Sequence, residues 1–334
     1  MSSTRIASVA YELGATRVDD AQLSQELRLP LDRVAELSRH RLRYSAPDGV
    51  GPADLAAGAA RRALRNAGMA PQDVDFIIFS TNTPDYTFPG SACLLQAAIG
   101  ARTIGCLDVR AVCSGFLVAL DLARRYCIGG RYGRVLVAAA EVPSHQNRYD
   151  GIDPEIACLT GDAGCAAVVR AGEGALQILG CRTLTDGSRH RILWCEFPAS
   201  RNLVSHGVSR GERLTRSAIE EGRIFPIVDF DGLRAAAIEG LPRVLDAALA
   251  EAGSSHVDAA LIAHLDPRTE ADVAELVAPR VGRVINSDMT YAYSASVPLA
   301  LGRALETGAV HAGETVALLT AGGGASWGAC VVRI

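Results

Sequence analysis

The sequence predicts an α/β protein in which one structural pattern is used twice. Short apolar runs typical of buried strands alternate with Ala- and Leu-rich amphipathic runs typical of helices, and such alternation favours layered α/β folds. The order of elements in the C-terminal part repeats that of the N-terminal part. We therefore expect two duplicated halves, residues 1–170 and 229–334, joined by an irregular insertion at 171–228.

The first half contains a clear succession of helix and strand patterns. Its expected helices are 52–69, 90–101 and 114–130, and its expected strands are 74–82, 103–112, 133–142 and 163–171. The second half repeats them, with expected helices at 229–253, 269–281 and 294–308 and strands at 257–265, 282–288, 313–323 and 326–334. Duplicated halves place equivalent strand ends face to face, where open α/β sheets usually hold ligands.

Composition excludes several classes of function. The 334 residues carry a net charge of −4 with no basic cluster, so nucleic acid is not an expected partner. The N-terminus lacks the pattern of a signal peptide, and no apolar stretch approaches the roughly 18–20 residues of a membrane span. Nine cysteines without a Cys-x-x-Cys pair suggest neither a disulfide framework nor a zinc site. We expect a reduced, cytoplasmic protein without a membrane partner.

Cys113 is the first candidate for chemistry, because it stands where a predicted strand changes into a predicted helix. A thiol at a helix start lies near unpaired N–H groups and the positive end of the helix dipole, which favour thiolate. Ser114 and Gly115 are small enough for a thioester to approach the backbone. The alternative is a buried apolar cysteine, which we expect for Cys106. This stretch alone leaves both interpretations of Cys113 open.

Two features of the second half favour the nucleophile. His264 ends the predicted strand 257–265, at a sheet end equivalent to that of Cys113. A lone histidine there is often structural, but the duplication predicts that it converges with Cys113 and can serve as a general base. The loop 321–330, AGGGASWGAC, has three consecutive glycines whose N–H groups could bind an oxyanion, or could simply form a tight bend.

Several stretches together resemble one protein family. DVRAVCSGFLVAL, TGDAGCAAVV, SASVPLAL and GGGASWGACVVRI occur in order, after LRNAGMAPQDVDFIIFST and FSTNTPDYTFPGSACLLQAAIGA. Over residues 5–334 the chain resembles the β-ketoacyl-acyl carrier protein synthase III family, which has the thiolase fold. The resemblance implies a five-layer αβαβα fold and a homodimer. It implies no permanently bound cofactor and no metal, with acyl-CoA or a carrier-protein phosphopantetheine thioester as co-substrate.

The resemblance also assigns roles to residues. Cys113 matches the family's acyl-carrying nucleophile and His264 its catalytic histidine. The N–H groups of Gly323 and Cys113 match the oxyanion hole. Phe88 matches the residue that reaches across the dimer to the partner's acyl pocket. Arg41 or Arg43 is expected to keep a basic contact to the nucleotide, although the family's early tryptophan motif is missing.

The departures from the family lie at its two asparagines. The span AHLDP, 263–267, places Pro267 where the family has an asparagine that contacts pantetheine. The span TYAYSAS, 290–296, places Tyr291 at the catalytic asparagine, or Thr290 if one residue is gapped. Asp266 and Asp288 are near enough in sequence to orient His264, although either can be a turn residue.

Three functions remain open. The first is an acyltransferase that loads an acyl group on Cys113 and passes it to an O or N nucleophile of a small-molecule acceptor, in secondary metabolism. The second is decarboxylative Claisen condensation with a malonyl thioester, which the missing asparagine handicaps. The third is a non-catalytic partner subunit, against which the retained Cys113, His264 and glycine loop argue.

Overall fold

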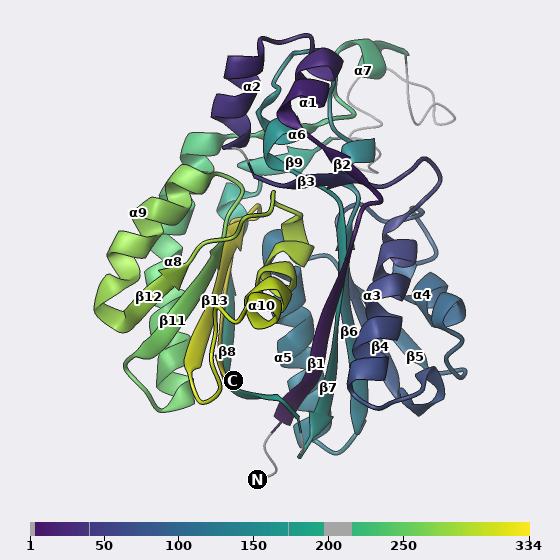
Figure 1. Ribbon diagram of the computed structural model, residues 1–334, viewed down its shortest axis with the longest axis vertical. Coiled ribbons are helices and arrows are strands. Elements are labelled where there is room, and N and C mark those ends of the chain that lie inside the picture. The colour runs from purple at the N-terminus through teal and green to yellow at the C-terminus, as the bar shows by residue number, and fades with distance from the viewer. Residues whose placement is uncertain (1–3, 40, 173, 197–215) are drawn as a thin grey trace.

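The computed structural model describes residues 4–39, 41–172, 174–196 and 216–334, and its main feature is a ten-stranded mixed sheet (Figure 1). The strand order is β12-β11-β13-β14-β8-β1-β7-β6-β4-β5. Two residue pairs between β1 and β8 join its halves. The strands are β1 Thr4–Leu13, β4 Phe76–Ser80, β5 Gly105–Val109, β6 Arg134–Glu141, β7 Ala163–Ala171, β8 Leu176–Thr185, β11 Val257–Ala263, β12 Val281–Ile285, β13 Thr315–Gly322 and β14 Ser326–Arg333.

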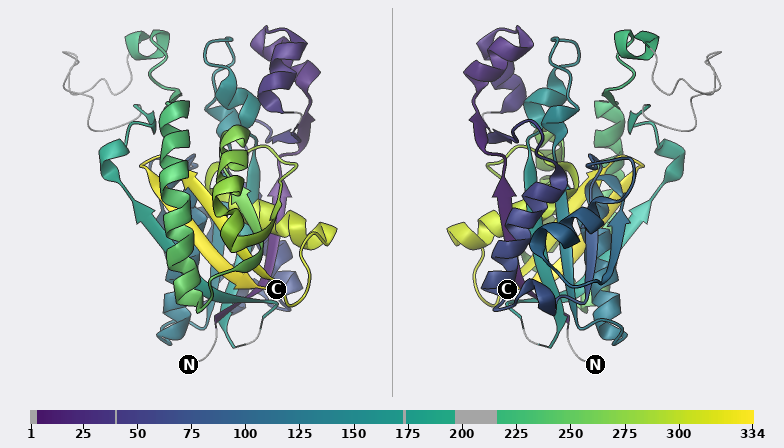
Figure 2. Two further views of the ribbon diagram at one scale, coloured as in Figure 1. Left: turned by 90° about the vertical axis from the view of Figure 1, so that its left-hand side faces the viewer. Right: turned by 90° about the vertical axis from the view of Figure 1, so that its right-hand side faces the viewer.

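Helices cover and separate the two half-sheets in five layers. Helices α5 and α10 lie between the half-sheets, α3 and α4 cover the first half, and α8 and α9 cover the second (Figures 1 and 2). Their bounds are α3 Pro52–Asn66, α4 Ser91–Ile99, α5 Gly115–Ile128, α8 Phe230–Ala252, α9 Pro267–Val277 and α10 Ser296–Thr307. The central helices are buried because their sequences are apolar on several faces, as the fully buried Phe116, Leu117 and Leu120 of α5 show. The predicted αβαβα fold is confirmed.

The sheet order also displays the duplication. Outward from the junction, the first half runs β1-β7-β6-β4-β5 and the second runs β8-β14-β13-β11-β12. In each half the two outermost pairings are parallel and the next is antiparallel. Strand β6 therefore corresponds to β13, and β4 corresponds to β11.

One prediction about the halves is wrong. The segment 171–228 is not an irregular insertion throughout, because β8 is a ten-residue strand paired with β14 and β1. Its sequence LQILGCRTLT alternates buried and part-buried positions, but Gly180 and the polar residues made the strand pattern weak. Strand β1, which pairs with β7, was also not among the expected elements.

Smaller elements gather at one end of the sheet (Figure 1). They are β2 Thr16–Val18, α1 Asp20–Leu27, α2 Leu31–Ser38, β3 Arg43–Ser45, α6 Glu155–Leu159, β9 Leu193–Cys195, α7 Arg216–Glu220 and β10 Pro226–Val228. A cavity of about 250 Å³ separates α2 from the start of α9, so these elements cover the region beyond the end of β11. Among the helices described, none is both long and apolar enough to cross a membrane.

Candidate active site

Cys113 lies between β5 and α5, in the short 3-10 turn η2 (Val112–Ser114). Val112 has a φ of +47°, a left-handed conformation that is unfavourable for a β-branched residue. Cys113 itself is 1% exposed. The predicted nucleophile thus follows a strained residue in a strand-turn-helix connection, a geometry typical of nucleophiles that are aimed into a site.

Burial controls the protonation of this thiol. It raises the pKa of Cys113 to about 12, although hydrogen bonds from the Tyr291 hydroxyl and the N–H groups of Gly323 and Cys113 lower it. The N–H groups lower the pKa of this thiol, as the sequence predicted, but desolvation has the larger effect and raises it overall. The thiol keeps its proton at neutral pH and must lose it during attack.

The glycine-rich loop after β13 lies against the thiol. A Cβ added at Gly322 would overlap the Cys113 sulfur. A Cβ added at Gly323 would come within 2.8 Å of the Leu193 carbonyl oxygen. Glycine is needed at both positions because the backbone approaches its neighbours so closely. The Gly323 N–H contacts Cys113, where the resemblance expects one donor of the oxyanion hole.

The ring of His264 is held by the backbone of Asp266. His264 directly follows β11 and is fully buried. Its Nδ1 lies 3.0 Å from the Asp266 nitrogen and 3.2 Å from the Asp266 carbonyl oxygen. That carbonyl already accepts a hydrogen bond from the Thr269 N–H at 3.1 Å, whereas the Asp266 N–H has Nδ1 as its acceptor. All three groups are satisfied when Nδ1 accepts, and we therefore assign the ring proton to Nε2.

Nε2 is the free end of this ring. It is buried and has no hydrogen-bond partner among the described residues. Burial lowers the pKa of His264 to about 4, although the backbone carbonyl and the charge of Asp266 raise it. The imidazole is therefore neutral at pH 7 and presents an N–H donor.

Of the two alternatives for the asparagine position, Tyr291 is the one that reaches Cys113. Its side chain is 3% exposed, and its hydroxyl is hydrogen-bonded to the thiol and lies 3.4 Å from Thr320 Oγ1. Burial and the neighbouring Cys113 raise the pKa of Tyr291 well above its usual range, so it stays a hydroxyl. The Thr290 hydroxyl instead donates to the Leu42 carbonyl at 3.2 Å.

The two candidate aspartates are engaged elsewhere. The Asp266 carboxylate caps α9 by accepting from the Arg268 N–H at 3.0 Å, and it pairs with the Arg268 guanidinium at 3.2 Å. Asp266 therefore orients His264 through its backbone rather than its carboxylate. Asp288 forms an ion pair with Arg303 of α10 and is half exposed.

The two candidate arginines point in different directions. Arg43 is 5% exposed, and its guanidinium donates to the Cys158 carbonyl in the interior. Arg41 forms a largely buried ion pair with Glu270 of α9. Nucleotide binding by Arg41 or Arg43 stays a prediction, and the burial of Arg43 disfavours it there.

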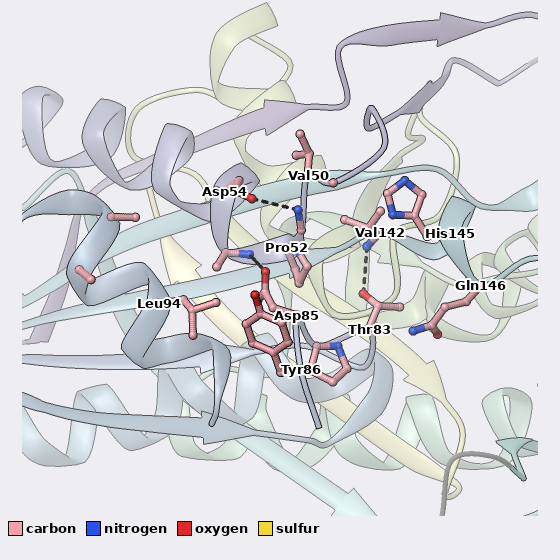
Figure 3. Close-up of a pocket in the computed structure, with 16 residues that line it drawn as sticks. Val50, Pro52, Asp54, Thr83, Asp85, Tyr86, Leu94, Val142, His145 and Gln146 are labelled. Carbon is pink, nitrogen blue, oxygen red and sulfur yellow. Dashed lines mark hydrogen bonds between the residues drawn. The ribbon is translucent and has the colours of Figure 1, made fainter. Parts of the chain in front are cut away.

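Two cavities adjoin other predicted features. The cavity of about 250 Å³ beside α2 includes Leu159, Asp266, Pro267 and Arg268 in its lining and therefore lies next to His264. A cavity of about 650 Å³ lies on the first half, between the start of α3, the second half of α4 and the residues after β6, with Asp85, Tyr86 and His145 on its wall (Figure 3). Cys113 and His264 do not line it. Phe88, near Tyr86 in sequence, is 78% exposed.

Two buried carboxylates near these residues were not predicted. Glu270 accepts a hydrogen bond from the His264 N–H at 3.1 Å, and Glu141 accepts one from the Ser294 N–H at 3.3 Å. Glu141 ends an otherwise apolar strand, AAAEV, and an acid at a buried strand end was an available signal. Nothing in the helical run TEADVAELV distinguishes Glu270 from the other acids.

The described residues hold a buried thiol with backbone N–H groups and a tyrosine hydroxyl around it, and a neutral imidazole directly after β11, the strand that pairs with β13. In the described part of the chain, no group of three or more His, Cys, Asp or Glu side chains could hold a metal ion. A thiol beside oxyanion donors forms acyl thioesters, and on a duplicated five-layer fold these features define an acyl-transferring enzyme of the thiolase class.

Comparisons with known proteins give the family. Residues 107–187 match the model of 3-oxoacyl-[acyl-carrier-protein] synthase III, and residues 250–334 match the model of its C-terminal part. The β-ketoacyl-[acyl-carrier-protein] synthase III of Rhizorhabdus wittichii is 32% identical over 323 residues, covering 95% of each chain. That of Rhodospirillum centenum is 34% identical over 310 residues, covering 90% of this chain and 89% of the relative. The chain belongs to the β-ketoacyl-acyl carrier protein synthase III family.

Solved structures agree with this assignment. The 3-oxoacyl-[acyl-carrier-protein] synthase III of Aquifex aeolicus superposes with a TM-score of 0.81 at 26% identity, covering 99% of this chain and 100% of that one. The tetronic acid condensing enzyme AbyA1, at 22% identity, shares the fold with a TM-score of 0.82 over 99% of this chain and 100% of its own.

Proposed function

We propose that the protein is a condensing enzyme of the synthase III type. Cys113 takes an acyl group from an acyl-CoA or acyl-carrier-protein thioester, and the acyl-enzyme then condenses with a malonyl thioester. The observation that supports this choice is the hydrogen bond from the Asp266 N–H to Nδ1 of His264, because it favours the tautomer in which the free Nε2 is an N–H donor rather than a lone pair. A donor stabilises an enolate oxygen but cannot accept the proton of an alcohol or amine. This reverses the order of the first two functions expected from sequence.

The chemistry has two half-reactions. Cys113 attacks the donor thioester, the new C–S bond replaces the old one, and the leaving thiolate takes the proton of the thiol. The oxyanion formed in this step is held by the N–H groups of Cys113 and Gly323. The malonyl thioester then loses carbon dioxide, its enolate carbon attacks the acyl carbonyl, and the Cys113 thiolate leaves and takes up a proton from water.

Tyr291 is proposed as the second enolate donor beside His264. Its hydroxyl is protonated, buried and adjacent to Cys113, where the resemblance expects an asparagine amide. Removing one such donor costs about 100- to 1000-fold in rate. For Tyr291→Phe we therefore expect decarboxylative turnover to fall by about 100-fold or more, with acyl loading of Cys113 affected less. Equal losses in both half-reactions would contradict this role.

A second candidate is acyl transfer to an O or N nucleophile. It is favoured by the two positions where the resemblance expects amides, because Pro267 and Tyr291 supply none. In this case Nε2 of His264 must give up its proton, and Nδ1 must turn from acceptor to donor.

The test begins with acyl loading. The protein is incubated with acyl-CoAs and carrier-protein thioesters, and an acyl adduct is sought by intact mass. The chain contains no lysine, so lysine acylation cannot imitate a cysteine adduct. Exposed Cys93 is the matched control: Cys93→Ser should load normally and Cys113→Ser should not. No adduct with any thioester would leave the non-catalytic partner subunit as the function.

The second half-reaction separates the two enzyme functions. Malonyl thioester labelled in its free carboxyl is added to the acyl-enzyme, and released carbon dioxide is measured. Condensation requires release in proportion to the acyl adduct consumed. A stable adduct in malonyl thioester that is discharged by hydroxyl or amine acceptors would overturn condensation in favour of acyl transfer.

A homodimer is part of the proposal. Phe88 and Tyr86 are 78% and 61% exposed on one chain, and large exposed apolar side chains are typical of subunit interfaces. Phe88→Asp should lower the oligomeric state in sedimentation experiments.

A further inference from the structure

A buried ion pair lies beneath His264. Glu270, in the first turn of α9, is 8% exposed, and its carboxylate pairs with the Arg41 guanidinium. The Arg41 and Glu270 side chains are 13% and 9% exposed, so the pair is largely shielded from water. Burial raises the pKa of Glu270, and the positive charge of Arg41 lowers it. Burying two charges has a desolvation cost that a purely structural contact does not require.

One oxygen of this carboxylate holds the backbone of His264. Oε1 of Glu270 accepts the His264 N–H at 3.1 Å, just where the chain leaves the sheet. The last residue of β11 that pairs with β13 is Ala263, so the His264 N–H has lost its neighbouring strand as a partner. The Glu270 carboxylate therefore accepts the His264 N–H in place of a carbonyl of a neighbouring strand.

The same turn of α9 also fixes the ring. The Asp266 N–H holds Nδ1, the Asp266 carboxylate caps α9, and Pro267 provides a first helical residue with a preset φ. The start of α9 thus restrains His264 at its backbone through Glu270 and at its ring through Asp266. Nε2 is left as the buried ring atom without a hydrogen-bond partner among the described residues.

We propose that Glu270, fixed by Arg41, is a positioning residue that sets the direction of His264 Nε2 for the second half-reaction. This inference rests on the proposed function, in which Nε2–H is an enolate donor. Loss of the carboxylate acceptor frees the His264 backbone and lets Nε2 move. A displacement of about 1 Å of a catalytic group can cost about 100-fold in rate.

A second ion pair of the same design provides the control. Glu251 of α8 pairs with Arg124 at 2.8 Å and accepts the backbone N–H of Cys181 at 3.0 Å, with side-chain exposures of 18% and 15%. It also receives Arg182 at 2.7 Å. Glu251 thus holds a strand backbone as Glu270 holds His264, but on β8 rather than beside the imidazole.

The experiment compares Glu270→Ala, Glu270→Gln and Glu251→Ala in the full-length protein. Acyl-Cys113 is formed from acyl-CoA, and its consumption by malonyl-CoA is followed per acylated protein by intact mass. We expect consumption to slow about 30- to 100-fold in Glu270→Ala. In Glu270→Gln, which keeps an acceptor for the His264 N–H, it should stay within about 5-fold of wild type. Both variants lose the ion pair with Arg41, so we expect similar losses in their free energies of unfolding. Their rates of acyl-enzyme consumption should nevertheless differ.

Glu251→Ala should lose stability without slowing consumption per acylated protein. If rate follows stability across all three variants, or if Glu270→Ala reacts at the wild-type rate, the positioning role is wrong. Should Glu270→Gln fold poorly because Arg41 is left unpaired, the double variant Arg41→Met and Glu270→Gln keeps the acceptor and removes the charge. It should then recover the rate that Glu270→Ala loses.

A measurement independent of turnover separates this inference from the proposed function. The ¹⁵N NMR shifts of the His264 ring report which nitrogen carries the proton. Wild type and Glu270→Gln should show one Nε2–H ring, whereas Glu270→Ala should show averaged or broadened ring signals. If wild-type acyl-enzyme does not react with malonyl-CoA, condensation fails, and the ring signals still decide whether Glu270 positions His264.

Discussion

The two halves of the fold use one equivalent position in opposite ways. Strand β6 ends at Glu141 and its counterpart β13 ends at Gly322. Each strand end lies against the 3-10 turn of the other half: Gly322 meets Cys113 of η2, and Glu141 meets Ser294 of η6 (Tyr293–Ala295). Both contacts, Gly322 with Cys113 and Glu141 with Ser294, therefore combine a strand end from one half with a helix start from the other.

The backbones at the two places match closely. Val112, before Cys113, has a φ of +47°, and Tyr293, before Ser294, has a φ of +38°. Two non-glycine residues in the left-handed region at equivalent positions indicate that the strain belongs to the duplicated turn itself. The strained turn is therefore not sufficient to make a nucleophile.

The two contacts differ in the side chain at the strand end. Glu141 is fully buried and accepts hydrogen bonds from Asn82, Thr83 and Ser294, the last at 2.5 Å from the serine oxygen. At Gly322 the strand has no side chain, and the sulfur of Cys113 occupies that space. At Ser294 the strand end of the other half supplies a hydrogen-bonded carboxylate, which we expect to stabilise the fold. At Cys113 the strand end of the other half supplies a glycine, which leaves room for the thiol.

The largest effect is expected at Glu141, because we expect the Glu141–Ser294 contact to stabilise the fold, unlike the Gly322–Cys113 contact. Glu141→Ala leaves buried N–H and hydroxyl donors of Asn82, Thr83 and Ser294 without their acceptor, and we expect a loss of about 4 kcal/mol in unfolding free energy. Glu141→Gln keeps one acceptor oxygen and should lose about half as much. Urea unfolding measures both. Similar stabilities for wild type and Glu141→Ala would show that this copy is not structural.

The next comparison is between the residues that follow β4 and β11, which are Thr81 and His264. Burial lowers the pKa of His264 to about 4, so the unfolded chain binds this proton first as pH falls. The neutral ring thus adds stability above about pH 6.5 that is lost towards pH 4, about 3 kcal/mol in total. His264→Gln should flatten this part of the stability curve by that amount, whereas Thr81→Val should not. An unchanged pH slope in His264→Gln would contradict the shift.

A smaller loss, confined to chemistry, is expected at Gly322. Gly322→Ala places a methyl group on the Cys113 sulfur, so the thiol must move by about 1 Å and acyl loading should slow by about 100-fold. Gly187→Ala is the matched control, because a Cβ there has open space and should leave loading unchanged. Intact mass against time measures the loading. Normal loading in Gly322→Ala would mean that the thiol attacks from another direction.

The sequence predicted the duplication and most strands because short apolar runs alternate with amphipathic helical runs in the same order in both halves. It also brought Cys113 and the glycine loop together, which the contacts of Gly322 and Gly323 with Cys113 confirm, whereas the convergence of His264 with Cys113 stays a prediction. It failed at β8, where Gly180 and exposed polar residues dilute the strand pattern. It did not predict the desolvation that raises the pKa of Cys113, because this burial depends on Tyr291, Gly322 and Gly323, which come from distant segments.

The supporting residues were beyond prediction for a related reason. Glu141 and Glu270 are buried because distant N–H groups and Arg41 surround them, and a single sequence does not display those partners. Tyr291 was one of two alternatives until the Thr290 hydroxyl was found to bond Leu42. Pairwise geometry between segments, rather than local pattern, decides these roles.

The smallest effect is expected at Ser294, the counterpart of Cys113. Ser294→Ala removes a hydrogen bond to a buried carboxylate and should cost about 2 kcal/mol in unfolding free energy, with acyl loading unchanged.

Ser294→Cys in a Cys113→Ser background tests whether position alone makes a nucleophile. We expect no acyl adduct at residue 294, because the Glu141 carboxylate occupies the place that Gly322 leaves open at Cys113 and opposes a thiolate there. Peptide mapping after incubation with acyl-CoA measures the adduct. An acylated Cys at 294 would show that the strained turn suffices, and the clearing of the strand end would then not be what distinguishes the two copies.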